Sequence, residues 1–284
     1  MAAVEAEAAI AVGPRADPLS VPAAAAASPE AVLSACCIGH LPPCFVPPLP
    51  YTMLCPAPLG LPGERVLDDE RFGPGIDGGA LAEYSQLFGL QDLLEAGDIV
   101  ADRLYLFQYR KFLGLRPGGA ASNAPWVRVL RPDIAPLLFP TWDELQQLRT
   151  PVVVGEVQAL GCSVAANYAE AHVGDDFALF TAAMAAAGIA LPAVRRFTLQ
   201  HGFIPSPALC LVDTPLFLQH MRVLRRVWQL FARELAVPRA GYQRRVTGYL
   251  LERLHSHLLC ESLMDGTQPS VGVAHRFVVL DPQA

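Results

Sequence analysis

The sequence contains a single lysine, Lys111, and its other basic residues are arginines and seven histidines. It has no run of 18 or more apolar residues, so no segment is a candidate membrane-spanning helix. The C-x-x-C pairs of zinc ribbons and redox proteins are also absent. An odd number of cysteines, seven, indicates reduced thiols and a cytoplasmic protein. The net charge of -6 argues against a general nucleic-acid-binding protein.

Several catalytic motifs are missing as well. No G-x-x-x-x-G-K-[ST], H-E-x-x-H or G-x-S-x-G pattern occurs, which counts against P-loop enzymes, zincins and α/β-hydrolases. The sequence also lacks the Asp-x-Asp motif that many sugar-nucleotide enzymes use to hold a metal ion. A G-x-G-x-x-G pattern at residues 73–78 follows an acidic stretch instead of a strand. We therefore interpret it as a glycine-rich loop.

Apolar runs and helical periodicities alternate along most of the chain. Four runs predict strands, at residues 34–40, 103–112, 151–154 and 209–212. Spacings of three and four residues predict five helices, at residues 81–96, 141–148, 165–187 with a break near Gly174, 214–235 and 242–263. This alternation predicts an α/β fold with a mainly parallel central sheet and C-terminal helices.

The ends of the chain differ in composition from its middle. Residues 1–33 are rich in alanine and proline and carry no basic and apolar signal-peptide pattern, so we expect a disordered extension. Residues 34–265 are expected to form one domain, and residues 266–284 a C-terminal tail. Two helix ends have clear signals: Thr141 and Glu144 match a capping box, and Gly97 matches a C-cap.

The segment at residues 103–112 changes abruptly from apolar to basic. Its apolar run is followed by Gln108, Tyr109, Arg110 and Lys111. In open α/β sheets, ligands bind beyond the carboxyl ends of the strands, so two cations at such an end indicate an anion-binding site. A core strand followed by a solvated basic turn fits the same residues.

Two helical clusters could also carry chemistry. Tyr168, His172 and Asp176 follow at spacings of four, and a histidine next to a carboxylate is a usable acid–base unit. A helix surface with an aspartate near a helix start explains the same spacing. Arg245 and Glu252 share one face of the last helix, either as a solvated ion pair or as part of a site.

Taken in order, these segments resemble the bacterial capsular-polysaccharide-synthesis glycosyltransferases, a family long described as a domain of unknown function. Its hallmark YIGLCHYRRYF is similar to Leu-Tyr-Leu-Phe-Gln-Tyr-Arg-Lys-Phe at residues 104–112. The sequence departs from the family at Gln108, which replaces a histidine, at Lys111, which replaces an arginine, and at Ala208, which replaces an asparagine. Other segments are also similar to segments of the family and occur in the same order along the chain, at residues 38–41, 83–90, 166–177, 208–217 and 245–254.

The resemblance implies a GT-A-like enzyme that transfers a sugar from a nucleotide-diphosphate donor to a polysaccharide or glycolipid acceptor. It implies no cofactor and no divalent metal, because side-chain cations can stabilise the leaving diphosphate. The alternative is a catalytically inactive relative that acts as a binding or scaffolding protein in polysaccharide assembly. The implied site residues are His172 and Asp176 for catalysis, His40, Glu83, Tyr109, Arg110 and Lys111 for the donor, and Gln108, Tyr168, Arg245 and Glu252 for support.

The basic residues are unevenly spread. Residues 222–253 contain eight arginines and two acids. Such a patch could meet an anionic substrate, a lipid headgroup or an acidic partner. Peripheral contact with the inner face of the membrane is therefore one expectation.

Overall fold

The computed structural model describes residues 31–68, 72, 78–124, 126–234, 239–264 and 271–280. Residues 1–30 of the expected extension, and all but one residue of the glycine-rich loop at 73–78, lie outside the described residues. The described strands form a ten-stranded sheet of order β3-β2-β1-β4-β11-β8-β12-β7-β6, in which β5 joins β4 to β12. A small separate pair consists of β9 and β10.

The strands are short, and several lie where the sequence indicated loops. The predicted strands correspond to β1 (Leu33–Ile38), β4 (Arg103–Gln108), β8 (Val152–Gly155) and β11 (Cys210–Asp213). The additional strands are β2 (Thr52–Cys55), β3 (Arg65–Val66), β5 (Lys111–Gly114), β6 (Ala120–Ala121), β7 (Arg128–Leu130), β9 (Gln158–Ala159), β10 (Gly202–Phe203) and β12 (Val271–Val279).

The prediction of a mainly parallel central sheet is wrong. Strands β3, β2, β1 and β4 are parallel, but β11 pairs antiparallel with both β4 and β8. Strand β12 is parallel to β8 and antiparallel to β5, and β5 closes back onto β4. The strands β4, β11, β8, β12 and β5 therefore form a small closed barrel in which every pairing except β8–β12 is antiparallel.

The physical reason is that an apolar run reports burial and not strand direction. A parallel neighbour needs a long crossover, whereas an antiparallel one can follow a tight turn. Here β4 returns immediately as β5 through a turn at Tyr109 and Arg110, with Gln108 paired to Lys111. The single long strand expected at residues 103–112 is therefore a hairpin.

The predicted helices are present with small shifts at their ends. Residues 165–187 form two helices, with the break at His172 and Val173, close to the expected position. Gly97 caps α2 in a left-handed conformation with φ 78°, as predicted. The helices are α1 (Gly78–Leu81), α2 (Tyr84–Ala96), α3 (Ala135–Leu138), α4 (Trp142–Gln147), α5 (Val164–Ala171), α6 (Gly174–Ala186), α7 (Leu191–Leu199), α8 (Thr214–Glu234) and α9 (Val246–Met264).

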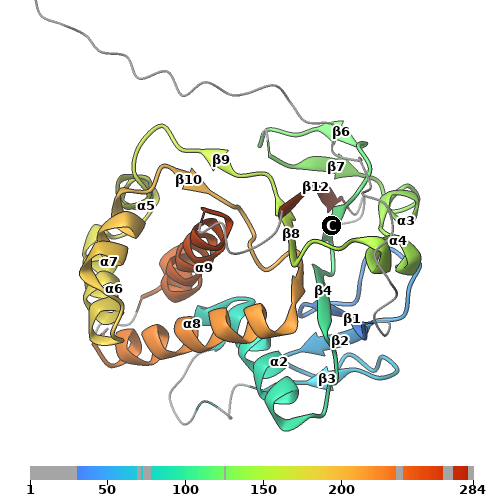
Figure 1. Ribbon diagram of the computed structural model, residues 1–284, viewed down its shortest axis with the longest axis horizontal. Helices are drawn as coiled ribbons and strands as arrows, with labels where there is room; N and C mark the ends of the chain where they lie inside the picture. The colour runs from blue at the N-terminus through green and yellow to red at the C-terminus, as the bar shows by residue number, and fades with distance from the viewer. Residues whose placement is uncertain are drawn as a thin grey trace, which may run out of the picture. The chain divides into compact units, whose positions relative to one another are not determined.

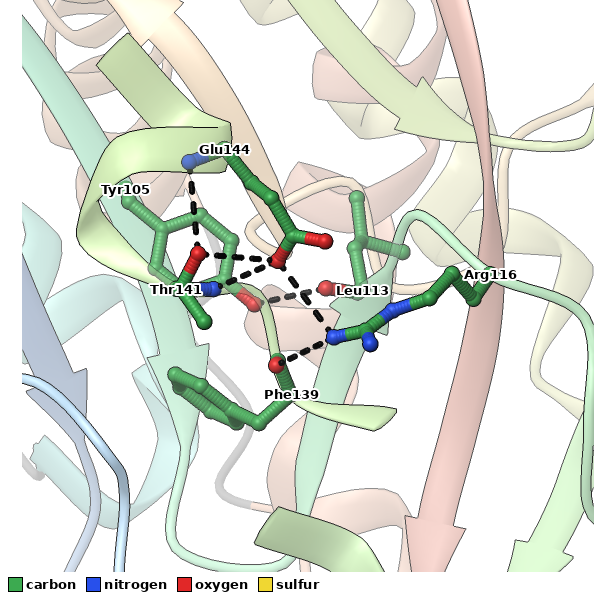
Figure 2. Close-up of polar contacts among 6 residues, drawn as sticks. All are labelled: Tyr105, Leu113, Arg116, Phe139, Thr141 and Glu144. Carbon is green, nitrogen blue, oxygen red and sulfur yellow. Dashed lines mark hydrogen bonds and ion pairs between the residues drawn. The ribbon is translucent and has the colours of Figure 1, made fainter. Parts of the chain in front are cut away.

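The predicted capping box at the start of α4 is confirmed (Figure 2). The Glu144 N–H donates to Thr141 Oγ1 at 3.3 Å, and the Thr141 N–H donates to Glu144 Oε2 at 2.8 Å. Arg116 extends from the end of β5 to the same carboxylate at 3.3 Å. This contact ties α4 to the barrel.

Strand β4 is buried on both faces, as its composition predicted. Leu104 and Leu106 belong to the core under the helices, and Tyr105 and Phe107 belong to the core on the other side of the sheet. The Tyr105 hydroxyl donates to the Leu113 carbonyl of β5 at 2.7 Å, which links β4 and β5 in addition to their Gln108–Lys111 pairing (Figure 2).

Helix α9 lies at the centre of the helical layer. Figure 1 shows it running between α8 and the group formed by α5, α6 and α7. It also contacts α1 and β10, so its side chains can reach several elements.

The C-terminal segment differs from the expectation of a tail at residues 266–284. It contains β12, which lies between β8 and β7 in the sheet and completes the barrel. None of the seven cysteines, all of which lie in the described part of the chain, forms a disulfide. Among the described helices, none combines the length and the apolar character needed to cross a membrane.

Candidate functional site

A pocket of about 450 Å³ opens at the end of β4, beside the turn between α1 and α2. It brings together all five predicted donor-binding residues and two of the support residues. We call it the cation pocket, and it is lined by Ile38, Gly39, His40, Pro56, Gly79, Ala82, Glu83, Ser85, Gln86, Gln108, Tyr109, Arg110, Lys111 and Arg245.

The β4–β5 hairpin explains how both cations reach one pocket. In a continued strand, Arg110 and Lys111 would point to opposite faces. Strand β4 instead ends at Gln108, and its partner Lys111 is the first residue of β5. The turn therefore presents Arg110 and Lys111 to the same space.

Tyr109 is held in the turn by contacts on several sides. Its ring packs edge-on against His40, with centroids 5.2 Å apart, and the Arg110 guanidinium lies 5.4 Å from its centre. The Tyr109 carbonyl accepts from the Cys44 N–H at 2.9 Å. A Cβ on Gly39 would lie 3.1 Å from the ring, so glycine allows the close approach of β1.

The cations of this pocket form no direct ion pair with a carboxylate among the described residues. Arg110, Lys111 and Arg245 take part in none of the ion pairs formed there. The acidic lining residue is Glu83, and burial, followed by the nearby Glu252, raises the pKa of its carboxyl. Lys111 and Arg245 oppose that shift more weakly. The pocket is therefore positively charged and suited to an anion.

One face of α9 approaches the cation pocket. A Cβ on Gly248 would lie 3.0 Å from the Cβ of Ala82, so glycine lets the helix pack tightly on the α1–α2 turn. Ala82 has a φ of 52°, and this bend precedes Glu83. The close approach places Arg245 and Glu252, one turn before and one turn after Gly248, near Glu83.

The expected ion pair between Arg245 and Glu252 is not among those formed by the described residues. The Arg245 guanidinium lies 5.8 Å from the centre of the Tyr249 ring. Glu252 Oε1 accepts from the Ser206 N–H at 2.9 Å. Arg245 and Glu252 both lie near Glu83, but each contacts another residue instead of its expected partner.

A second group, the His172 cluster, consists of Tyr168, His172, Tyr242 and Tyr249. The His172 ring lies 4.6 Å from Tyr168, 4.5 Å from Tyr249 and 5.4 Å from Tyr242. Its Nδ1 is 3.3 Å from Gln243 Oε1. Burial lowers the pKa of His172, which keeps the imidazole neutral at neutral pH.

Asp176 lies beside this cluster and is fully buried. Its Oδ1 accepts from Arg239 Nη2 at 2.7 Å, and no hydrogen bond joins it to His172 in the described part of the chain. Arg253 lies 5.0 Å from the centre of the Tyr168 ring. The predicted catalytic residues His172 and Asp176 therefore lie in the same region, but the Asp176 carboxylate is hydrogen-bonded to Arg239.

Two of the four arginines of α8 form ion pairs within the molecule. Arg222 pairs with Glu95 of α2 at 2.8 Å, and Arg225 pairs with Asp92. These contacts join α8 to α2 and reduce the charge available to a lipid surface. Among the described residues, no group of three or more His, Cys, Asp or Glu is arranged to hold a metal ion.

Some pocket residues were not expected from the sequence. Gln86 follows Glu83 by one helical turn, so the position of Glu83 could have indicated it. Gly39 precedes His40, and its role depends on a ring that is distant in sequence. No local signal identifies it.

The fold is shared with a solved glycosyltransferase. The apo structure of WbbM, a bifunctional glycosyltransferase, is similar with a TM-score of 0.66 at 15% sequence identity. The match covers 89% of this chain and 46% of that chain, so this chain spans about half the length of WbbM. No protein-family model matches the sequence, and no curated protein matches it. At this identity the similarity concerns the fold.

Proposed function

We propose that the chain is a glycosyltransferase that binds a nucleotide-diphosphate sugar in the cation pocket. One observation carries the proposal: Arg110, Lys111 and Arg245 converge on a pocket without carboxylate ion pairs. The fold that presents them is similar to that of a glycosyltransferase. The acceptor in this proposal is a polysaccharide or glycolipid.

The chemistry requires stabilisation of the charge that develops on the leaving diphosphate. Cations gathered in one pocket can supply such stabilisation. Tyr109 offers an aromatic surface beside them, on which a nucleobase can stack. In this proposal Arg110, Lys111 and Arg245 serve the diphosphate without a divalent metal.

In this proposal His172 is the group that receives the proton of the reacting acceptor hydroxyl. Its neutral imidazole is able to accept a proton from a hydroxyl group. Asp176 is fully buried and bonded to Arg239, so we assign it a positioning role at the junction of α5 and α6.

A calorimetric titration tests donor binding. Nucleoside diphosphates and their sugars are titrated into the wild type and Arg110→Ala, in EDTA and in Mn²⁺. The matched control is Arg226→Ala, an exposed arginine of α8 outside the pocket. We expect Arg110→Ala to weaken binding roughly 10- to 100-fold, because a charge-assisted contact is lost. Equal affinities for the two variants would refute the assignment, and binding that disappears in EDTA would refute its metal independence.

A catalytically inactive binding protein is the second candidate. The observation that favours it is Gln108, which lines the pocket where the resembling family has a histidine. Such a protein would bind the donor with the same dependence on Arg110. It would release no nucleoside diphosphate when donor and acceptor are supplied together.

A further inference from the structure

A second pocket, of about 260 Å³, opens beside β12. Its side chains come from β12, from the end of β8 and from the region of β7. We call it the Arg276 pocket, and its lining includes Gly118, Trp126, Arg128, Glu156 and Arg276.

Arg276 is an unusual residue for an interior strand because it is only 4% exposed. Its Nη1 donates to the Trp126 carbonyl at 3.1 Å, whereas Nε and Nη2 are buried without a hydrogen-bond partner. Almost all buried polar groups in proteins are hydrogen-bonded, so two unsatisfied nitrogens on one guanidinium require an explanation. A ligand that accepts hydrogen bonds from this guanidinium would provide one.

The neighbouring backbone leaves room for this guanidinium. A Cβ on Gly155, at the end of β8, would lie 2.1 Å from Arg276 Nη2. No other residue type could occupy position 155 without displacing Arg276. The glycine and the arginine therefore form one local arrangement, built by the pairing of β8 with β12.

The charge of Arg276 is not neutralised by a direct ion pair in the described part of the chain. Burial lowers the pKa of Arg276 to about 10, and the more distant Glu252 and Glu156 oppose this shift. The guanidinium is still protonated at neutral pH. Arg128 adds a second fixed cation, since it donates to the carbonyls of Gly118 at 3.2 Å and Gly119 at 2.9 Å.

Glu252 relates the two pockets. It raises the pKa of Glu83 in the cation pocket and also interacts with Arg276. Glu252 therefore lies within electrostatic reach of a group in each pocket. Its smaller volume suits a single sugar residue better than a nucleotide, and the exposed Trp126 offers a face against which a sugar ring can pack.

We propose that the Arg276 pocket is the acceptor subsite and that it binds a sugar with an anionic group, a carboxylate or a phosphate. The term acceptor rests on the proposed glycosyltransferase function; the anion-binding site itself does not. Arg276 and Arg128 would bind the anion, and Glu156 would accept from a sugar hydroxyl.

The probes for this site are glucuronate, glucose 6-phosphate and neutral glucose, titrated into the full chain by calorimetry. We expect at least one of the two anions to bind more tightly than glucose. Arg276→Met should weaken that binding roughly 10- to 100-fold. Comparing the two anions separates a carboxylate from a phosphate preference.

Further variants keep the test decisive. Should Arg276→Met fail to fold, Arg128→Gln at the pocket rim should still reduce anion binding, and Gly155→Ala should do so by displacing Arg276. Arg110→Ala is the matched control, because it should weaken nucleotide binding and leave glucuronate or glucose 6-phosphate binding intact. Anions that bind no better than glucose, or that depend on Arg110 and not on Arg128 or Arg276, would overturn the inference. Nucleoside diphosphate affinity in the same variants tests the proposed function separately.

Discussion

The cation pocket and the His172 cluster both contain residues that the sequence marked as functional, but their internal bonding differs. In the cation pocket, Arg110 and Lys111 form none of the ion pairs found among the described residues. Beside the His172 cluster, Asp176 is bonded to Arg239 and His172 faces Gln243. The spacing of these residues along the chain gave no indication of this difference in bonding.

The difference indicates which region is organised around a ligand. A charge that is paired within the protein contributes to folding, and its removal is felt first in stability. A cation held in a pocket without a counter-ion contributes little to folding, and its removal is felt first in binding. Substitutions in each region, and at one residue between them, test this distinction.

The largest effect on stability is expected for Asp176→Ala. The substitution removes a fully buried carboxylate and its 2.7 Å bond from Arg239. The free energy of unfolding should fall by about 2 kcal/mol, the usual size for a lost charge-assisted hydrogen bond. Denaturant unfolding measures it, and Asp175→Ala, at an exposed position in the same turn, is the matched control.

Turnover of the folded fraction distinguishes the two roles of Asp176. In our account the conservative Asp176→Asn keeps most of its activity per folded molecule. A general base would lose about 10²- to 10⁴-fold in rate. A loss of that size without any loss of stability would show that Asp176 is catalytic.

Glu252 lies between the two regions and should give an intermediate effect. Glu252→Ala leaves the Ser206 N–H without its acceptor, and Ser206 has a φ of 51°. A loss of about 1 kcal/mol in the free energy of unfolding is expected, and Glu252→Gln should restore most of it because the acceptor oxygen remains. Equal free energies of unfolding for the Ala and Gln variants would show that this hydrogen bond does not stabilise the fold.

The smallest effect is a pH dependence from Glu83 in the cation pocket. Burial and Glu252 raise the pKa of Glu83 in the folded protein above its ordinary value of 4.5. The folded state therefore holds this proton more tightly, and wild-type stability is lost as the pH rises through the folded pKa. Glu83→Gln should match the wild type at low pH and become relatively more stable as the pH rises above 4.5. A difference that is constant with pH would contradict the shift.

Much of the local structure was predictable because its signals are local. The capping box of Thr141 and Glu144, the C-cap Gly97 and the apolar stripe of α8 each depend on neighbours a few residues away. The same is true of the polar turn after β4. Its residues reach the pocket because the strand ends at Gln108.

The remainder depended on pairings between distant segments. The antiparallel placement of β11 between β4 and β8 follows from the whole topology, and nothing in its four residues reports a direction. Strand β12 has an alternating apolar pattern, but it lies in a segment whose composition suggested a tail. Arg276 within that strand was missed for the same reason, and Gly155 explains it only once β8 and β12 are paired.

The most direct test of the central claim is whether Lys111 contacts the diphosphate. Calorimetry would compare the affinities of a nucleoside and its diphosphate for the wild type, Lys111→Met and the control Arg226→Met. We predict that Lys111→Met weakens diphosphate binding at least about tenfold, leaves nucleoside binding unchanged, and thereby gives a coupling free energy of about 1.4 kcal/mol or more. If both ligands lost affinity equally, or neither lost any, the cation pocket would not be the diphosphate site.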